Sequence, residues 1–185
     1  MNPSEAVIAT LRALRDAGVP HLLTGGLAAN VYGFSRATKD ADIVIEMQLP
    51  GFDNFARQLP PELELDPQVS FETITGSHRH IITLQRSAFR IELFLLGRDP
   101  HHCERFQRRI ERFVPDLDIT AWIATAEDMV IQKVRWNRDK DRDDARNILA
   151  VQDDALDFAY IERWCDTHGT RARLEELRRS IPPMD

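Results

Sequence analysis

The stretch "LLTGGLAANVYGFSRATKDADIVIE", residues 22–46, decides how the rest of the chain is interpreted. An apolar run is followed by the pair Gly25–Gly26, a segment of small residues, and a second apolar run that carries Asp-x-Asp. The apolar runs predict two strands, and the segment between them predicts a short helix that begins directly after the glycines. The unusual feature is the placement of two negative charges, Asp40 and Asp42, in an otherwise apolar strand.

Asp40 and Asp42 are expected on the same face of that strand, because successive side chains of a strand point to opposite faces. Two carboxylates so close together repel each other unless water or a cation screens them. Oxygen donors without His or Cys favour Mg²⁺ or Mn²⁺ over Zn²⁺. The alternative is an edge-strand pair that is simply solvated, since so short a motif often occurs by chance.

A third acid, Glu92, lies in the apolar run "FRIELFLL", residues 89–96. An unpaired carboxylate is strongly unfavourable there. Phosphoryl transfer with two metal ions normally uses a third carboxylate, and Glu92 is the best candidate for it. Residues 78–96 predict a hairpin that turns near Ser87–Ala88. The alternative is a plain ion pair across the sheet, for which the candidate cations are Arg90, Arg86 and Lys39.

The composition indicates a globular protein: of 185 residues, 43% are hydrophobic and 29% are charged. The net charge of −6 argues against a general nucleic-acid coat protein. No apolar run approaches the roughly 20 residues that span a bilayer, and the N-terminal stretch mixes acids and arginines, unlike a signal peptide. Two cysteines without a CxxC motif predict no disulfide framework. We therefore expect a cytoplasmic protein without a membrane partner.

The pattern of elements changes at Thr125. Before it, helical and strand segments alternate, starting with a helix that Ser4 is expected to cap. After it, every segment has helical character, and Thr125 followed by Glu127 and Asp128 is a typical helix start. The chain is thus predicted to be an α+β protein, with a mixed-sheet core and flanking helices in residues 1–124. A helical C-terminal lobe is predicted for residues 125–185.

The order of strand, Gly-Gly, short helix, Asp-x-Asp strand and later acidic strand resembles the polymerase-β-type nucleotidyltransferase superfamily. The chain also resembles a bacterial branch that includes nucleotidyltransferase toxins of abortive-infection systems. That second likeness rests on an Arg-x-Thr before the acids, a downstream Glu-Asp, a helical lysine and an Asp-rich helix. In this sequence they are Arg36-Ala37-Thr38, Glu127-Asp128, Lys133 and "DKDRDD" at 139–144. The resemblance covers residues 22–149, and departs from the pattern at Glu92, where Asp is commoner.

The resemblance implies transfer of a nucleoside monophosphate from an NTP to a hydroxyl of RNA, protein or a small molecule, with release of pyrophosphate. It also implies two bound Mg²⁺ (or Mn²⁺) ions and, for the toxin-type branch, a partner antitoxin protein. A helix N-terminus after the glycines favours a bound phosphate. The implied site residues are Asp40, Asp42 and Glu92 for metal binding and catalysis, and Gly25, Gly26, Arg36 and Lys133 for the nucleotide.

Other polar and aromatic residues are given structural roles. The histidine-rich segments match no common zinc spacing, so surface or loop positions are expected. Asp141 and Asp144 are expected on a solvated helix face, with orientation of Lys133 as an alternative. The remaining groups are Trp122, Trp136 and Trp164, expected in packing between the two parts, and Arg105, Arg108, Arg109 and Arg112, expected on a solvated helix.

Two other functions compete with the enzyme. A nucleotide-binding or antitoxin-like module of the same fold would have little turnover, although the intact acids Asp40, Asp42 and Glu92 argue against it. A metal-dependent nuclease would use the same acids but leaves Gly25–Gly26 unexplained.

Overall fold

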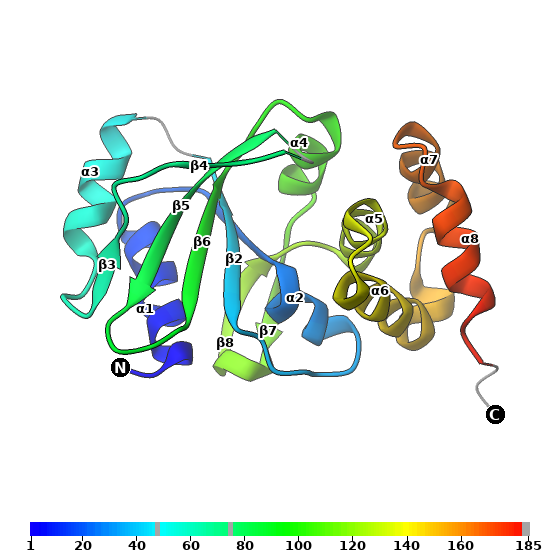
Figure 1. Cartoon of the computed structure of the whole chain (residues 1–185), viewed down its shortest axis with the longest axis horizontal. Helices are drawn as coiled ribbons and strands as arrows, with labels where there is room; N and C mark the ends of the chain where they lie inside the picture. Colours follow the sequence, from blue (N-terminus) through cyan, green and yellow to red (C-terminus); the bar gives the residue numbers. More distant parts are fainter. Residues whose placement is uncertain (47–48, 74–75, 183–185) are drawn as a thin grey trace.

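One mixed sheet forms the framework of the molecule (Figure 1). The computed structural model describes residues 1–46, 49–73 and 76–182. Within these residues eight strands form the order β3-β5-β6-β2-β1-β8-β7, with β4 paired to β5 outside this path. The strands are β1 His21–Thr24, β2 Asp40–Ile45, β3 Leu63–Leu65, β4 Ser70–Glu72, β5 Ser77–Leu84, β6 Arg90–Leu95, β7 Ile110–Val114 and β8 Ile119–Ile123.

Helices cover both faces of this sheet. Figure 1 shows α1 and α3 on one side of it, and α2 with α5 to α8 on the other. The prediction of an α+β protein with flanking helices and a helical C-terminal lobe is confirmed. The helices are α1 Pro3–Asp16, α2 Gly25–Tyr32, α3 Leu49–Gln58, α4 Pro100–Gln107, α5 Ala126–Trp136, α6 Asp139–Gln152, α7 Phe158–Thr167 and α8 Arg171–Arg179, with 3₁₀ turns η1 Pro115–Leu117 and η2 Asp153–Ala155.

The cap of the first helix differs from the prediction. Asn2, and not Ser4, caps α1: its side chain accepts a hydrogen bond from the Glu5 amide at 2.9 Å, and the Glu5 carboxylate accepts one from the Asn2 amide at 2.7 Å. This reciprocal pair satisfies two amides that have no partner within the helix. Ser4 lies in the first turn, and its hydroxyl donates to the Asp116 carbonyl.

The central strand β2 carries the Asp-x-Asp motif between β1 and β6. It is antiparallel to β1 and parallel to β6. Ala41, Ile43 and Ile45 are buried on one face, as the alternation of side chains predicts. Asp40 and Asp42 point to the opposite face, toward the connection between α5 and α6.

Helix α5 begins where the sequence predicts a helix start. Thr125 caps α5, and its hydroxyl accepts a hydrogen bond from the Asp128 amide at 3.3 Å. The helix ends at Asn137, whose left-handed φ of 56° lets the chain turn into α6. Trp164 is buried as expected, but Trp122 is 39% exposed, so the packing role predicted for it is wrong. Among the described residues, no helix combines the length and apolar character needed to cross a membrane.

Candidate active site

The three predicted acids converge on one cavity. Asp42 and Glu92 are direct neighbours across the parallel strands β2 and β6, and Asp40 lies two residues before Asp42. All three line a cavity of about 110 Å³ between the sheet and the connection from α5 to α6. Its other lining residues are Glu72, Arg79, Phe94, Trp136, Arg138 and Lys140.

Asp42 is a buried acid with a raised pKa. Asp42 on β2 pairs with Thr24 on the neighbouring strand β1. Thr24 is the residue before α2, so the N-terminus of α2 lies beside Asp42. Burial, and then the negative charges of Asp40 and Glu92, raise the pKa of Asp42 to about 7, although Lys133 and Lys140 oppose the shift. Burial and repulsion therefore disfavour the ionised form of Asp42, and acids perturbed in this way are common in functional sites.

The donor set of the cavity fits a hard divalent cation. Asp40, Asp42 and Glu92 present carboxylate oxygens, and Glu72 adds a fourth carboxyl group. Mg²⁺ and Mn²⁺ prefer such oxygen donors, whereas Zn²⁺ more often takes nitrogen or sulfur. The raised pKa of Asp42 is the second feature that fits such an ion, because a cation would offset the burial and the repulsion that cause it.

Gly25 allows Asp42 to approach α2 closely. Its φ of 69° lies in the left-handed region that side chains disfavour. A Cβ atom at Gly25 would overlap the Asp42 carboxylate and lie 2.7 Å from its Cγ. A Cβ atom at Gly26 would similarly overlap the Thr38 side chain. Packing next to the acids therefore requires both glycines, and their contact with a nucleotide stays a prediction.

We expect Gly25→Ala to destabilise the fold by about 2–4 kcal/mol, because left-handed strain and overlap with Asp42 add together. Gly18→Ala is the matched control. Gly18 has a φ of 68°, but no heavy atom lies within 4 Å of the position that a Cβ atom would take there. Only the strain, about 1–2 kcal/mol, applies at Gly18. Urea denaturation of both variants measures the difference, and equal losses would contradict the overlap with Asp42.

Glu92 has a cationic partner that sequence reasoning did not find. Arg79 Nη1 on β5 lies 2.5 Å from Glu92 Oε2. The cation at Glu92 is thus Arg79, and the candidates Arg90, Arg86 and Lys39 were wrong. Lys140 Nζ lies 4.0 Å from Asp40 Oδ2. Two of the three acids are therefore paired with cations of the chain itself.

Other charged residues of the cavity were also missed. Glu72 comes from the three-residue strand β4, and Arg138 and Lys140 come from the start of α6. Strand β4 carries no motif of its own, and the fold alone brings Glu72 to the acids. The sequence offered one usable signal, the position of Lys140 inside the Asp-rich segment that the resemblance had already marked.

A buried network of ion pairs joins the core to the helical lobe. Lys133, only 2% exposed, places Nζ 3.1 Å from Asp141 Oδ1 and 2.7 Å from Asp144 Oδ2. Arg36, from the loop before β2, binds Asp144 through Nε and Nη2 at 2.6 and 2.7 Å. Arg138 adds a second cation to Asp141. Hydrogen bonds between charged groups, and paired ones from one arginine above all, are stronger than hydrogen bonds between neutral groups.

This network corrects the prediction for Asp141 and Asp144. They are buried, at 0% and 4% exposure, and do not form a solvated helix face. Burial alone would raise the pKa of Asp144, but hydrogen bonds and charges from Arg36 and Lys133 lower it. The alternative prediction, that these acids orient Lys133, agrees with the geometry. Arg36 and Lys133 do not line the cavity of the three acids, so their contact with a nucleotide stays a prediction.

The histidines and the first arginine of α4 are also buried, contrary to the prediction. His101, His102 and Arg105 are 1%, 5% and 1% exposed. His101 Nε2 lies 3.1 Å from Asp128 Oδ1, which also accepts a hydrogen bond from the Tyr160 hydroxyl at 2.7 Å. Burial lowers the pKa of His101 and His102, the latter to about 2. Both rings are therefore neutral at pH 7, and this neutrality makes their burial possible.

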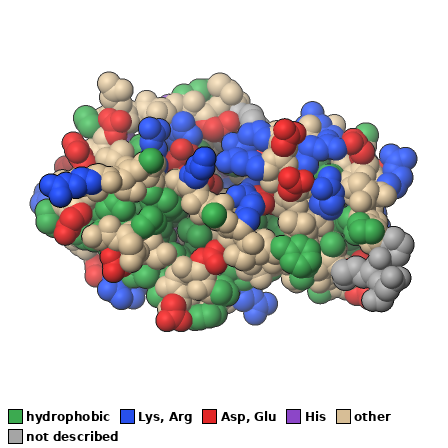
Figure 2. Space-filling model, turned by 60° about the horizontal axis from the view of Figure 1, so that its bottom comes forward, with side chains coloured by type: hydrophobic (Ala, Val, Ile, Leu, Met, Phe, Trp, Pro, Cys, Tyr) green, Lys and Arg blue, Asp and Glu red, His purple; other side chains and the backbone are tan. Residues whose placement is uncertain are grey.

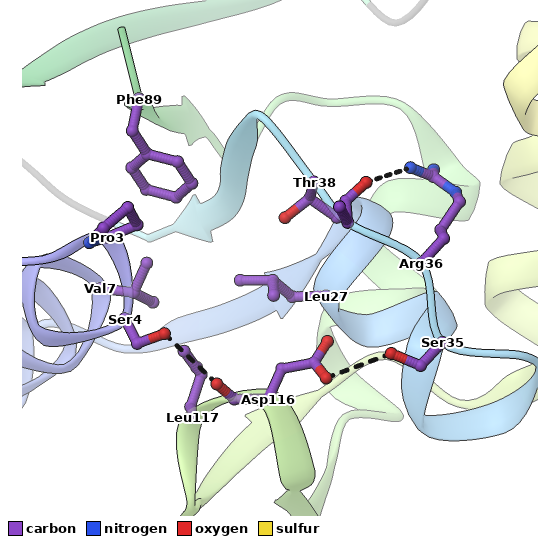
Figure 3. Close-up of a pocket in the computed structure, with 11 residues that line it drawn as sticks. Pro3, Ser4, Val7, Leu27, Ser35, Arg36, Thr38, Phe89, Asp116 and Leu117 are labelled. Atoms are coloured by element: carbon purple, nitrogen blue, oxygen red, sulfur yellow. Dashed lines mark hydrogen bonds between the residues drawn. The ribbon is translucent and has the colours of Figure 1, made fainter. Parts of the chain in front are cut away.

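A larger cavity of about 250 Å³ lies beside the loop that leads into β2 (Figure 3). Val7, Leu27 and Phe89 supply part of its apolar lining. Figure 3 shows the Ser4 and Ser35 hydroxyl groups bonded to Asp116 in its wall. None of the three acids lines this cavity, and these polar groups already have partners. We assign it no ligand.

The surface charge does not indicate a nucleic-acid site. Figure 2 shows Lys and Arg side chains gathered over the half of the molecule that holds α5 to α8, with acidic side chains among them. Many are paired: Arg171 binds Glu162 and Glu175, and Arg178 also binds Glu162. A nucleic-acid site is expected to present an uncompensated basic stripe instead.

Comparison with known proteins supports the fold through structure and not through sequence. The sequence matches no protein-family model and no curated protein. The structure titled "Crystal structure of putative nucleotidyltransferase from H. pylori" is similar with a TM-score of 0.52 at 14% identity, covering 100% of this chain and 83% of that chain. ANT(2″)-Ia in complex with adenylyl-2″-tobramycin gives a TM-score of 0.61 at 12% identity, covering 91% and 98%. The solution structure of the antibiotic-resistance factor ANT(2″)-Ia gives 0.58 at 12%, covering 95% and 96%.

At these identities the likeness establishes the fold. The chain has the fold of polymerase-β-type nucleotidyltransferases, as its sequence resemblance implied.

Proposed function

We propose that this protein is a divalent-metal-dependent nucleotidyltransferase. It transfers a nucleoside monophosphate from an NTP to a hydroxyl acceptor and releases pyrophosphate. The observation that carries the proposal is the convergence of Asp40, Asp42 and Glu92 on one cavity beside the N-terminus of α2. The nucleotidyltransferases with similar folds support the same reaction class.

In the proposed reaction the acceptor oxygen bonds to the α-phosphorus while the bond from that phosphorus to the bridging oxygen breaks. The electron pair of the broken bond leaves with pyrophosphate. The proton of the acceptor hydroxyl passes to the Glu92 carboxylate. Mg²⁺ or Mn²⁺ held by Asp40, Asp42 and Glu92 would neutralise phosphate oxygens and lower the pKa of the acceptor hydroxyl. The amides at the start of α2, from Gly25 and Gly26 onward, favour the triphosphate.

The size of the cavity limits what it encloses. Its volume of about 110 Å³ is below the roughly 300 Å³ or more of a small-molecule site. It suits the cations and the reacting phosphoryl group, with the nucleoside and the acceptor outside its mouth. Arg138 and Lys140 line the cavity with half-exposed side chains, and we propose that they contact the outer phosphates. Arg36 and Lys133 would then act mainly by fixing α6 in position.

The acceptor is proposed on weaker grounds. ANT(2″)-Ia was solved with an adenylylated small molecule, and this favours a small hydroxyl compound as the first acceptor class to test. RNA and protein acceptors remain part of the proposal, as does a toxin role with an antitoxin partner. The toxin role rests on the sequence resemblance, and its test is growth arrest on expression that Asp42→Asn relieves.

Arg79→Met is expected to tighten Mn²⁺ binding by about tenfold, because a charged hydrogen bond that competes for Glu92 is removed. Isothermal titration with Mn²⁺, without nucleotide, measures the change. Arg90→Met is the matched control, since Arg90 is exposed on the adjacent strand and does not line the cavity. Unchanged or weaker binding in Arg79→Met would show that Arg79 does not compete with the ion.

The direct test uses each α-labelled NTP with Mg²⁺ and separate RNA, protein and aminoglycoside acceptors. We expect label on one acceptor class, pyrophosphate release, and no label with Asp42→Asn. The wild-type protein could instead be folded and bind NTP with Mg²⁺, yet transfer no label to these acceptors or to any component of a whole-cell extract. That result would contradict the enzyme proposal and favour the nucleotide-binding module.

A further inference from the structure

A second group of potential metal ligands lies where α4 meets the C-terminal end of α7. One donor atom from each of Asp99, His101 and His168 lies within 4.8 Å of the other two. Asp99 caps α4, His101 lies in its first turn, and His168 caps the end of α7. We propose that these three side chains bind a Zn²⁺ ion that links the core to the helical lobe. This site is separate from the nucleotidyl-transfer proposal.

His101 has a carboxylate partner on one of its two ring nitrogens. Its Nε2 lies 3.1 Å from Asp128 Oδ1. Burial alone would raise the pKa of Asp128, but hydrogen bonds from His101 and Tyr160 lower it, so the carboxylate is ionised and can only accept. The neutral His101 ring therefore donates from Nε2 and keeps its lone pair on Nδ1. Metal-binding histidines commonly donate their other ring N–H to a carboxylate in this way.

His168 supplies a donor atom without a partner. Its Nδ1 is buried and makes no hydrogen bond within the described part of the chain. Burial, followed by the charge of Arg135, lowers the pKa of His168 to about 4, so the ring is neutral at pH 7. An unpaired buried ring nitrogen is unfavourable, and a bound ion would satisfy it.

Asp99 is an ionised carboxylate whose position is fixed by two partners. One oxygen accepts the His102 amide at 3.0 Å, and the other lies 2.8 Å from Arg135 Nη1. Each carboxylate oxygen can accept more than one partner, so Asp99 can still bind an ion through one oxygen. Arg135 repels a dication and limits the affinity of the site, while Asp99 and the nearby Asp128 offset the charge of the ion.

Two imidazole nitrogens and one carboxylate oxygen, with water as a fourth ligand, form a set typical of Zn²⁺. Tetrahedral ligands at Zn²⁺ distances lie about 3.3 Å apart. The donors, now within 4.8 Å, must therefore close by up to about 1.5 Å. His168 can supply this movement, because it is half-buried at a helix end. Trp164 packs against both rings, with centroids 5.0 Å from His101 and 5.5 Å from His168.

The test strips the full-length protein with EDTA and adds back Zn²⁺ or Co²⁺. We expect one Zn²⁺ per chain by elemental analysis, a visible Co²⁺ ligand-field spectrum, and a Tm rise of about 5–10 °C at a hundredfold excess over Kd. His168→Ala should lose all three signals. Asp99→Asn should lose them too while keeping the α4 cap, because Asn caps helices as well as Asp does.

Two controls separate this site from other metal binding. His78→Ala removes an exposed histidine on β5 and should leave the three signals unchanged. Asp42→Asn should also leave them unchanged, because it alters only the carboxylate cavity. The proposal is overturned if wild type takes up no Zn²⁺, if His168→Ala binds as wild type does, or if Asp42→Asn abolishes uptake.

Discussion

Asp42→Asn is expected to lower nucleotidyl transfer by about 10³-fold or more. The amide cannot replace a carboxylate as an anionic metal ligand, and Asp42 lies between Asp40 and Glu92 in the cavity. The measurement is label transfer from the α-labelled NTP at saturating Mg²⁺, with circular dichroism as the check on folding. If the activity of Asp42→Asn stays within tenfold of wild type, Asp42 has no essential role in the reaction.

The same substitution is expected to stabilise the metal-free protein at high pH. The folded pKa of Asp42, about 7, lies above its ordinary value of 3.8. The folded state therefore favours the protonated carboxyl group, and stability from this group is lost as the pH rises from about 4 through 7. At pH 8 the ionised carboxylate costs on the order of a few kcal/mol, and Asn avoids this cost.

The comparison must be made in EDTA. We expect the stability advantage of Asp42→Asn to grow between pH 5 and pH 8. The buried histidines contribute equally to the pH dependence of both proteins. Their contribution therefore cancels in the difference between the two free energies of unfolding. Asp154→Asn, at an exposed position, is the control and should show no such growth. An Asp42→Asn protein that is less stable than wild type at pH 8 would contradict the conclusion that burial and repulsion disfavour the ionised form of this carboxyl group.

Asp144→Asn is expected to lower the free energy of unfolding by about 3–5 kcal/mol. Asp144 is the common anion of Arg36 and Lys133, and Lys133 cannot reach water from its buried position. Removing one partner of a buried pair leaves the other charge without compensation, which is the costly case. Urea denaturation followed by tryptophan fluorescence measures the loss.

Asp143→Asn provides the matched control one residue away. The Asp143 side chain is 64% exposed and pairs with Arg146 at 3.0 Å, so its loss should change stability little. If the two variants lose the same amount, the buried network contributes no more than a surface ion pair. If only Asp144→Asn also weakens Mn²⁺ binding, the network additionally fixes the position of the acids.

The acids of the cavity were predictable because the signals that mark them are local. Alternation along a strand places Asp40 and Asp42 on one face from sequence alone. Glu92 stands out as an acid in an apolar run, and parallel pairing then makes it the neighbour of Asp42. The metal-binding roles of these residues stay predictions.

Arg79 was missed because of strand register. A turn centred on Ser87–Ala88 would place Glu92 opposite Thr83. In the structure Glu92 lies opposite Ile81, which brings Arg79 into the diagonal position on the same face. A shift of two residues keeps the face of every side chain but changes its partner, so hydrophobic alternation could not detect it.

Burial of charged residues was the least predictable property. Asp141, Asp144 and His101 look like solvated residues in sequence, since their partners are distant: Arg36 and Asp144 are separated by 108 residues. Tertiary pairing decides whether such a group is buried. The division of the chain at residue 124 stays a prediction.

The pairing of Arg36 with Asp144 ties the position of the first acid to that of a distant helix. Arg36 lies four residues before Asp40 on the loop that leads into β2, and Asp144 lies on α6, which lines the cavity through Lys140. Any movement of α6 must carry this loop along or break the double hydrogen bond between Arg36 and Asp144. The positions of α6 and of Asp40 are therefore mechanically coupled.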